Sequence, residues 1–355
     1  MLEDRAAGAI MGALIGDALG LGCHWYYNLD ELHRDFGPWI ADYSTPRKDR
    51  YHAGMTAGQL SQTGIIFVML LRSVVENKEY LENDFTRRLD EDLFPLLDGS
   101  PNNGPGGYTN QSIRDAYRQR IEQKKSWAEI HGNSDTTEAA ERCIVLASRY
   151  AKHPAKVAVT VSANCTLTQN DEMVVAMTTA YNCILAQLIS GDCLTPSISN
   201  KLMDLVYSGT LPFHTITALE TPTKKNLNRP QAGEFSSPDA LLTAGFAAQA
   251  AQDVGINIEP ASKVSTIYGM PCAIYHQLPA AYYLGARFKN DFESAVLHAI
   301  NGGGQNMSRA MLTGALVGAQ VGLTGIPKRF IDGLENSEEL LQLAKNLAEL
   351  AANNQ

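Results

Sequence analysis

The feature that most restricts the fold of this chain is a set of glycines repeated at every fourth position near the N-terminus. Gly8, Gly12 and Gly16 follow this spacing inside a stretch, Asp4 to Leu21, that favours a helix. Residues four apart lie on one face of an α-helix, and a face of small residues lets a second helix approach closely. The N-terminus therefore predicts a helix in tight contact with another helix.

A second stretch of small residues follows three consecutive glycines near the C-terminus. Residues 301–308 read "NGGGQNMS", and the residues that follow place Gly314, Ala315, Gly318 and Ala319 at close helical spacing. Glycine serves tight turns and close backbone approach, so a run of three is weak evidence of catalysis. The segment predicts a close-approach loop that opens into a packed helix.

The remaining segments predict an all-α protein. About ten of them have helical periodicity, and almost none has the alternation of a half-buried strand. Hydrophobic residues make up 45% of the 355 residues and charged residues 19%, which favours a packed globule over a disordered chain. We therefore predict one compact multi-helix domain over residues 1–355, with less than about a tenth of the residues in strands.

Charge and composition exclude several classes of function. A net charge of -9 argues against a nucleic-acid surface, which needs basic patches. The Gly/Ala-rich N-terminal stretch is too short and too polar to span a membrane or to act as a secretory leader. The six cysteines form no CxxC pair. These features predict a cytoplasmic protein with reduced thiols and leave its oligomeric state open.

Three segments contain residues that could carry chemistry, and each also has a structural interpretation. Asp17 could hold a cation or cap a neighbouring helix. His24 and Trp25, in "CHWYYN", could stack on a planar ligand or belong to the core. Asp135 and Glu138, in "GNSDTTEAAER", lie at a predicted helix start with Ser134 or Asp135 as the N-cap, which suits an anion or ribose site or plain capping.

Taken in order, these segments resemble the ADP-ribosylglycohydrolase superfamily, the family of dinitrogenase-reductase-activating glycohydrolase. "GAIMGALIGDALG" is similar to its N-terminal signature and "NGGGQNMSRAMLTGALVGAQVG" to its C-terminal one. "LGCHWYYN" and Arg309-Ala310 most resemble the J-crystallin and selenoprotein J branch. The resemblance implies an all-α bundle of many helices around a central cleft. Gly303, Gly304 and Asn306 would form its floor, with His24 or Trp25 at its wall.

Enzymes of this superfamily hold two magnesium ions with aspartates from two acidic stretches, and here those stretches fall on residues 60–63 and 305–308. Thr63 and Ser308 match the family pattern, but neutral side chains replace four expected aspartates: Ser61, Gln62, Gln305 and Met307. Magnesium prefers charged oxygen ligands and disfavours a thioether. The resemblance therefore predicts a degenerate site with no tightly bound metal pair, and leaves weak magnesium binding open.

Three functions are compatible with these residues. The first is a hydrolase of an ADP-ribosyl or related glycosidic bond with a rebuilt site, in which Asp17, Asp135, Glu138 or Asp171 does the acid–base work. The second is a non-catalytic protein that binds a nucleotide or ribose. The third is a crystallin-like structural protein. In the first two, the partner is a small ADP-ribose-like or nucleoside ligand, and Gln62 and Gln305 should lie at one cleft.

Overall fold

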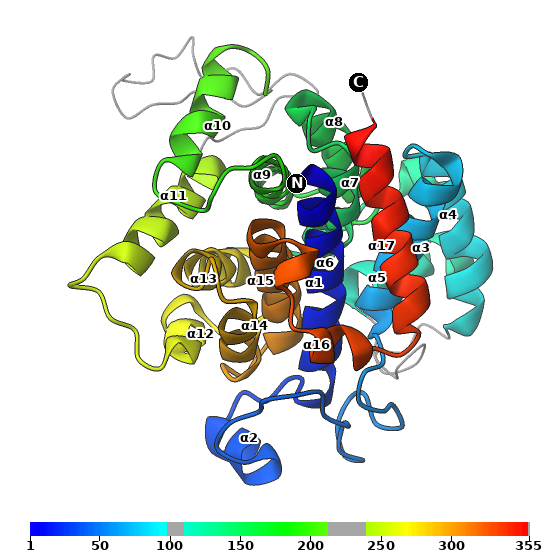
Figure 1. Ribbon diagram of the computed structural model, residues 1–355. Coiled ribbons are helices and arrows are strands. Elements are labelled where there is room, and N and C mark those ends of the chain that lie inside the picture. Colours follow the sequence, from blue (N-terminus) through cyan, green and yellow to red (C-terminus); the bar gives the residue numbers. More distant parts are fainter. Residues whose placement is uncertain (98–109, 212–238, 354–355) are drawn as a thin grey trace, which may run out of the picture.

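The two stretches of small residues pack against each other at the centre of the computed structural model (Figure 1). They lie in α1 (Leu2–Gly22) and α15 (Asn306–Val321). A Cβ atom added to Gly12 would lie 2.1 Å from the carbonyl oxygen of Gly314, and one added to Gly8 would lie 2.3 Å from that of Gly318. The predicted close contact between helices is therefore present, and it joins the two ends of the sequence.

Helices account for all the regular secondary structure in the described parts of the chain, residues 1–97, 110–211 and 239–353. No β-strand occurs in these ranges, and the one extended pairing there is an isolated bridge between Thr136 and Ala273. The prediction of an all-α fold is therefore confirmed.

The other helices with eight or more residues are α2 (Leu29–Phe36), α3 (Gln62–Asn77), α8 (Pro154–Thr166), α9 (Glu172–Ile189), α10 (Ile198–Tyr207), α11 (Asp239–Gln252), α13 (Ile274–Arg287), α14 (Phe292–Ile300) and α17 (Ser337–Ala352). The shorter helices are α4 (Glu82–Arg88), α5 (Gln111–Tyr117), α6 (Glu138–Arg142), α7 (Ile144–Arg149), α12 (Val264–Tyr268) and α16 (Lys328–Asp332).

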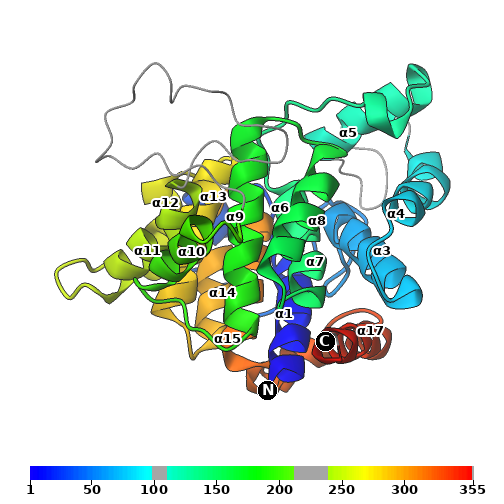
Figure 2. The same ribbon diagram turned by 90° about the horizontal axis from the view of Figure 1, so that it is seen from above.

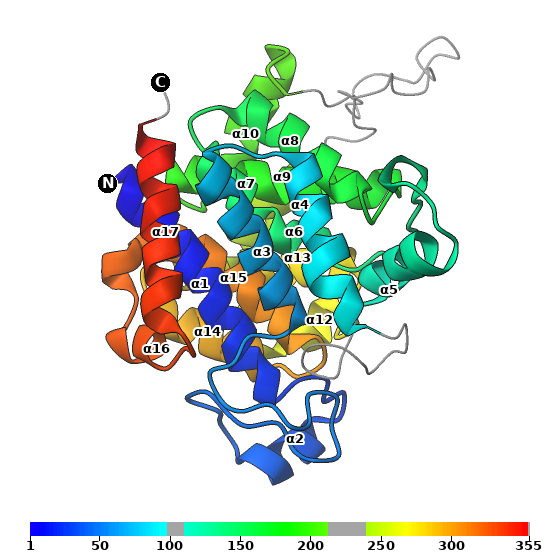
Figure 3. The same cartoon turned by 90° about the vertical axis from the view of Figure 1, so that its right-hand side faces the viewer.

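The remaining helices surround the α1–α15 pair. From above, α10 to α14 lie on one side of the pair, and α3, α4 and α17 lie on the other (Figure 2). Figure 3 shows α17 beside α1 and α3, while α2 lies at one end of the bundle. Helix α1 is buried from Ala6 to its last residue, so it is a core helix with no solvent-facing side.

Helix α9 is the one described helix that is long and apolar enough to cross a membrane. Its most apolar window is 78% buried inside the protein, as expected of a core helix. Asp171 precedes it, and its side chain accepts hydrogen bonds from the amides of Met173 and Val174. Asp171 therefore caps α9, which gives a structural reason for this carboxylate.

Two sequence predictions differ from the structure near the centre of the bundle. The sequence of residues 134–151, a capping pattern followed by an apolar run, favours one continuous helix, but the chain forms α6 and α7 with a break at Cys143. The N-cap of α6 is Thr137, so the prediction that Ser134 or Asp135 caps this helix is wrong. Both residues instead lie in a segment without regular secondary structure, where the Asp135 carbonyl accepts a hydrogen bond from the amide of Ile274.

Candidate functional site

Asp17 of α1 connects this helix to the start of α3. Its carboxylate accepts hydrogen bonds from the Ser61 amide at 2.8 Å and from the Ser61 hydroxyl at 2.6 Å. The same hydroxyl oxygen caps α3 by accepting from the amides of Thr63 and Gly64. A Cβ atom on Gly64 would lie 2.3 Å from the Asp17 carboxylate, so only glycine leaves room for it.

The surroundings of Asp17 also change its acidity. Burial raises the pKa of Asp17 to about 6, although the two hydrogen bonds from Ser61 oppose the shift. The sequence left two roles open for Asp17, holding a cation or capping a neighbouring helix. The geometry shows that Asp17 binds Ser61 at the start of a neighbouring helix. Because its pKa is raised, the Asp17 carboxyl group can also gain or lose a proton near neutral pH.

A chain of hydrogen bonds runs from α3 through α5 to α6. The side-chain oxygen of Gln62 accepts from the Asn110 amide at 3.3 Å, and the Asn110 side chain caps α5 by accepting from the Ser112 amide at 3.1 Å. The Ser112 hydroxyl then donates to Glu138 at 3.2 Å. Gln62 and Glu138, 76 positions apart in the printed sequence, are thus connected through two residues.

Glu138 is fully buried and pairs with an arginine one turn later on α6. Arg142 donates to the same Glu138 oxygen that receives the Ser112 bond, and its other nitrogens donate to Asn164 and Thr168. The second oxygen of Glu138 has no hydrogen-bond partner among the described residues. The positive charge of Arg142 neutralises Glu138. Glu138 therefore has a structural role and is poorly suited to act as a free acid.

Glu141 is a third buried carboxylate, and it was not among the residues predicted from the sequence. It accepts a 2.5 Å hydrogen bond from the Thr137 hydroxyl and a further bond from Ser308 of the glycine-rich loop. Burial raises the pKa of Glu141 to about 7, and the negative charges of Glu138 and Asp17 add to this shift. Its three-residue spacing from Glu138 puts both on one helix face, a signal visible in the sequence.

Gln305 and Ser308 bring the second family stretch to the same place. The Gln305 side-chain nitrogen donates to the Ser308 hydroxyl at 2.9 Å, and Ser308 in turn contacts Glu141. The Gln305 side-chain oxygen is buried and has no hydrogen-bond partner within the described ranges. A buried acceptor without a donor is energetically unfavourable, so this atom suits a ligand hydroxyl or amine.

The two glycines of the loop are required by its backbone. Gly303 and Gly304 have φ angles of 64° and 59°, in the left-handed region that favours glycine. A Cβ atom on Gly303 would lie 2.6 Å from the carbonyl oxygen of Tyr26, and one on Gly304 would lie 2.5 Å from Met270. The glycines therefore let the loop pack between two segments, which accounts for them without a ligand.

Asn306 and His24 are buried in the same region and contact each other. The Asn306 side-chain nitrogen lies within 3.0–3.4 Å of acceptors on Gly20, Cys23 and Ile300. Its oxygen lies 3.2 Å from Nδ1 of His24. Burial holds the pKa of His24 well below its usual value, and the neighbouring His52 adds to the shift. These contacts make His24 and Asn306 part of the core and leave no exposed face for stacking.

Trp25 and Asp135 lie nearer the surface than the residues above. Trp25 has a φ of 66°, and its ring meets that of Tyr51 edge-on at 4.4 Å. Asp135 accepts a 2.6 Å hydrogen bond from the hydroxyl of Tyr275. Burial raises the pKa of the Cys272 thiol, and the negative charges of Asp135 and Glu141 add to this shift.

The donors at this centre are a poor match for a pair of magnesium ions. Three carboxylates lie here, but Asp17 is bonded to Ser61 and Glu138 is paired with Arg142. The other groups are amides and hydroxyls, which bind a hard cation weakly when few charges help. Across residues 1–97, 110–211 and 239–353, no group of three or more His, Cys, Asp or Glu side chains has an arrangement that would hold a metal.

The structure defines the class of this protein as an all-α bundle with a buried polar centre where α1, α3, α6 and α15 meet. A family model for ADP-ribosylglycohydrolase matches residues 1–355, so the chain belongs to the ADP-ribosylglycohydrolase family. The assignment to the J-crystallin and selenoprotein J branch stays a prediction.

Individual relatives support the fold more than the activity. A solved structure described as "ADP-ribosylglycohydrolase-related protein complex" has a TM-score of 0.62, with 99% of each chain covered and 17% sequence identity. An uncharacterised protein from Archaeoglobus fulgidus is 35% identical over 89 residues, which are 25% of this chain and 26% of that protein. The matched part is therefore about a quarter of either sequence, and neither of these two relatives gives a substrate for this protein.

Proposed function

We propose that the protein hydrolyses a glycosidic bond to an ADP-ribosyl or related nucleoside group, and that it does so without a magnesium pair. The observation that carries this proposal is Glu141, a buried carboxyl group with a pKa of about 7 in contact with Ser308 of the family's C-terminal signature. A general acid works best when its pKa lies near the working pH. Side chains whose pKa is strongly shifted from its usual value cluster at functional sites.

The reaction needs one proton donor and one proton acceptor. Glu141 gives its proton to the leaving-group oxygen or nitrogen as the bond to the anomeric carbon breaks. Asp17, with a pKa of about 6, is mostly ionised at neutral pH and takes a proton from the water that adds to that carbon. A pair of carboxyl groups with these two roles is the usual arrangement for glycoside hydrolysis.

Neutral side chains then hold the sugar in place of metal ligands. Gln62, Thr63, Gln305 and Ser308 supply amide and hydroxyl groups at the positions where the resemblance implies aspartates and hydroxyls. The unpartnered side-chain oxygen of Gln305 accepts a hydrogen bond from a ribose hydroxyl. Trp25 and Asp135, which are only half-buried, contact the remainder of the ligand.

A non-catalytic binding protein is the second candidate. Asp17 is bonded to the cap of α3 and Glu138 is paired with Arg142, whereas Glu141 accepts hydrogen bonds from the Thr137 and Ser308 hydroxyls and has no cationic partner among the described residues. If Glu141 cannot reach the bond, the same amides and hydroxyls bind the sugar without cleaving it. A cytoplasmic location suits both candidates and is part of the proposal, supported by six cysteines that are all free thiols.

A hydrolysis assay with and without a chelator separates these candidates. The substrates are N-linked and O-linked ADP-ribosyl conjugates, and released ADP-ribose is measured in EDTA and in magnesium. We expect equal rates in both buffers and a loss of at least about 100-fold in Glu141→Gln. The exposed Glu349→Gln is the matched control and should keep full activity. Turnover that EDTA abolishes would overturn the proposal, and binding of ADP-ribose without turnover would favour the second candidate.

Calorimetry with magnesium tests directly whether the side chains at the polar centre are poor ligands for this metal. We expect no binding of magnesium at micromolar concentration to the parent protein, because charged ligands are too few at this centre. The double variant Gln62→Asp with Gln305→Asp restores two carboxylates on opposite segments and should gain measurable binding. Two tight sites in the parent would show that Asp17, Glu138 and Glu141 rearrange to form a metal site.

A further inference from the structure

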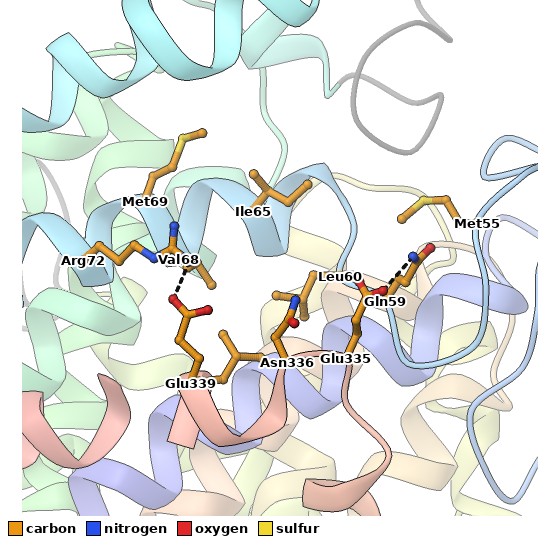
Figure 4. A pocket seen from close by; sticks show the side chains of 11 residues that line it. Met55, Gln59, Leu60, Ile65, Val68, Met69, Arg72, Glu335, Asn336 and Glu339 are labelled. Atoms are coloured by element: carbon orange, nitrogen blue, oxygen red, sulfur yellow. Dashed lines mark hydrogen bonds and ion pairs between the residues drawn. The ribbon is translucent and has the colours of Figure 1, made fainter. Parts of the chain in front are cut away.

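A groove of about 410 Å³ lies between α3 and the start of α17, outside the polar centre (Figure 4). This volume is within the range of small-molecule sites. Most of its surface is aliphatic or thioether. The apolar lining consists of Met55, Leu60, Ile65, Val68, Met69 and Leu340.

A polar contact crosses the groove near each end. Arg72 of α3 pairs with Glu339 of α17 at 2.6 Å, and the Gln59 side-chain amide donates to Glu335 at 3.1 Å. Figure 4 shows these two contacts on opposite sides of Ile65 and Leu60. The groove therefore suits a ligand of limited length better than an extended peptide that continues past both ends.

The charges around the groove favour a cation. Glu339 is balanced by Arg72, but no described Lys, Arg or His forms an ion pair with Glu335, which receives only the neutral Gln59 amide. The start of α17 could attract an anion, because Asn336 makes no side-chain cap there. However, Glu338 and Glu339 already place two negative charges in that first turn, which offsets the helix dipole.

The backbone around Glu335 is also fixed in place. The Glu335 amide donates to the carbonyl of Gly58 at 2.9 Å, and a Cβ atom on Gly58 would lie 2.2 Å from the carbonyl oxygen of Gly333. The next residue, Asn336, has a φ of 58°, in the left-handed region. The carboxylate is therefore presented by a loop whose position is set by close backbone contacts, so little ordering is needed when a ligand binds.

We propose that this groove binds a small molecule with an unbranched apolar body and one cationic group of the ammonium or guanidinium class. The apolar body lies along Ile65, Val68 and Met69, and the cation lies against Glu335. Methionine side chains adapt to an irregular apolar surface, so Met55 and Met69 can close around bodies of slightly different shape. The proposal is independent of the glycosidic activity, because none of these residues belongs to the polar centre.

Methyl NMR on the full-length protein with ¹³C-labelled methionine tests this site. The probe is octylammonium, below the concentration at which it aggregates, compared with octanol and octanoate of the same chain length. Met55→Leu and Met69→Leu identify the two signals. We expect both signals to shift in a saturable way with octylammonium, at higher concentration with octanol, and not with octanoate. Saturable binding of octanoate would instead show an anion site at the start of α17 and overturn the proposal.

Variants then separate charge from apolar contact. Glu335→Gln should weaken octylammonium binding about two- to five-fold, the range of an exposed ion pair, without affecting octanol. Glu338→Gln removes the same charge from an exposed neighbour that does not line the groove and should leave binding unchanged. Met69→Ala should weaken both probes. Equal effects of Glu335→Gln and Glu338→Gln, or no saturable shift at all, would refute the site.

Discussion

Helices α1 and α15 meet in two regions with opposite construction. Along most of their length they touch through glycines, and no side chain separates their backbones at Gly12 and Gly314. At one end, near Asp17 and Ser308, the same two helices approach α3 and α6, and carboxylates, amides and hydroxyls fill the space. The first region excludes side chains, while the second depends on partners for each buried polar group.

This difference decides how each region responds to substitution. In the glycine contact any added atom is too large, whatever its chemistry, because both sides are backbone. In the polar centre the size of a side chain matters less than its charge and hydrogen bonds, because an unpaired buried charge is costly. The two regions should therefore lose stability for different reasons when their residues are substituted.

The largest effect should come from Arg142→Met in the polar centre. This change keeps an unbranched side chain but removes the charge that neutralises Glu138, which is fully buried. Breaking a buried ion pair from one side costs about 3–5 kcal/mol. We expect a loss of this size in the free energy of unfolding, measured by urea denaturation.

An exposed arginine provides the matched control for Arg142→Met. Arg87 pairs with Asp84 and Glu91 on the surface, so Arg87→Met should cost less than about 1 kcal/mol. Adding Glu138→Gln to Arg142→Met should recover part of the loss, because the unpaired charge is gone. Similar losses for the two arginines would show that the buried pair adds nothing beyond a surface contact.

The second effect is a dependence of stability on pH that comes from Glu141. Its pKa is raised from 4.5 to about 7 in the folded protein, so the folded state holds its proton over a range where the unfolded chain has lost it. The resulting stabilisation is complete below pH 4.5 and is lost as the pH rises through about 7. The full change is on the order of 3 kcal/mol for a shift of this size. Urea denaturation between pH 4 and pH 8 measures it.

Glu141→Gln is the test variant for this slope. The amide cannot ionise, so the decline in the free energy of unfolding between pH 4 and pH 7 should become shallower. Asp17, whose pKa is about 6, keeps a smaller slope of the same sign in this variant. An unchanged slope in Glu141→Gln would mean that other groups carry the pH dependence.

The glycine contact was predictable from the sequence because its signal is local. Gly8, Gly12 and Gly16 fix a helix face by their spacing alone, and a second set near residue 314 has the same property. The all-α fold follows from the same periodicity. The pairing of the other helices and the break between α6 and α7 could not be predicted in this way. Both depend on packing among segments that are far apart in the sequence.

The polar centre was only partly predictable, for a related reason. Asp17 was predicted from its place near a helix end, and Gln62 and Gln305 from the family resemblance, and the structure brings the three to one region. Glu141 was not predicted, because its spacing from Glu138 places the two glutamates on one helix face but does not show that this face is buried, and a glutamate on a helix is usually exposed. Asn306 was expected to contact a ligand, but its side chain is used to hold the loop against α1. Hydrogen-bond partners far apart in the sequence decide these roles.

The smallest of the expected effects tests the glycine contact itself, through Gly12→Ala. The added methyl group would lie 2.1 Å from the Gly314 carbonyl oxygen, and neither backbone can rotate away. Overpacking of this kind costs about 1–3 kcal/mol, which exceeds the gain of about 1 kcal/mol that alanine brings to a helix. Gly255→Ala is the control, since its nearest neighbour would be the Asp253 side chain at 3.1 Å and no backbone lies close. Urea denaturation should show a loss for Gly12→Ala and a change within about 1 kcal/mol for Gly255→Ala. If Gly12→Ala were as stable as the parent protein, the helices would have room to separate, and the close contact would not be what fixes the position of Asp17 beside Ser61.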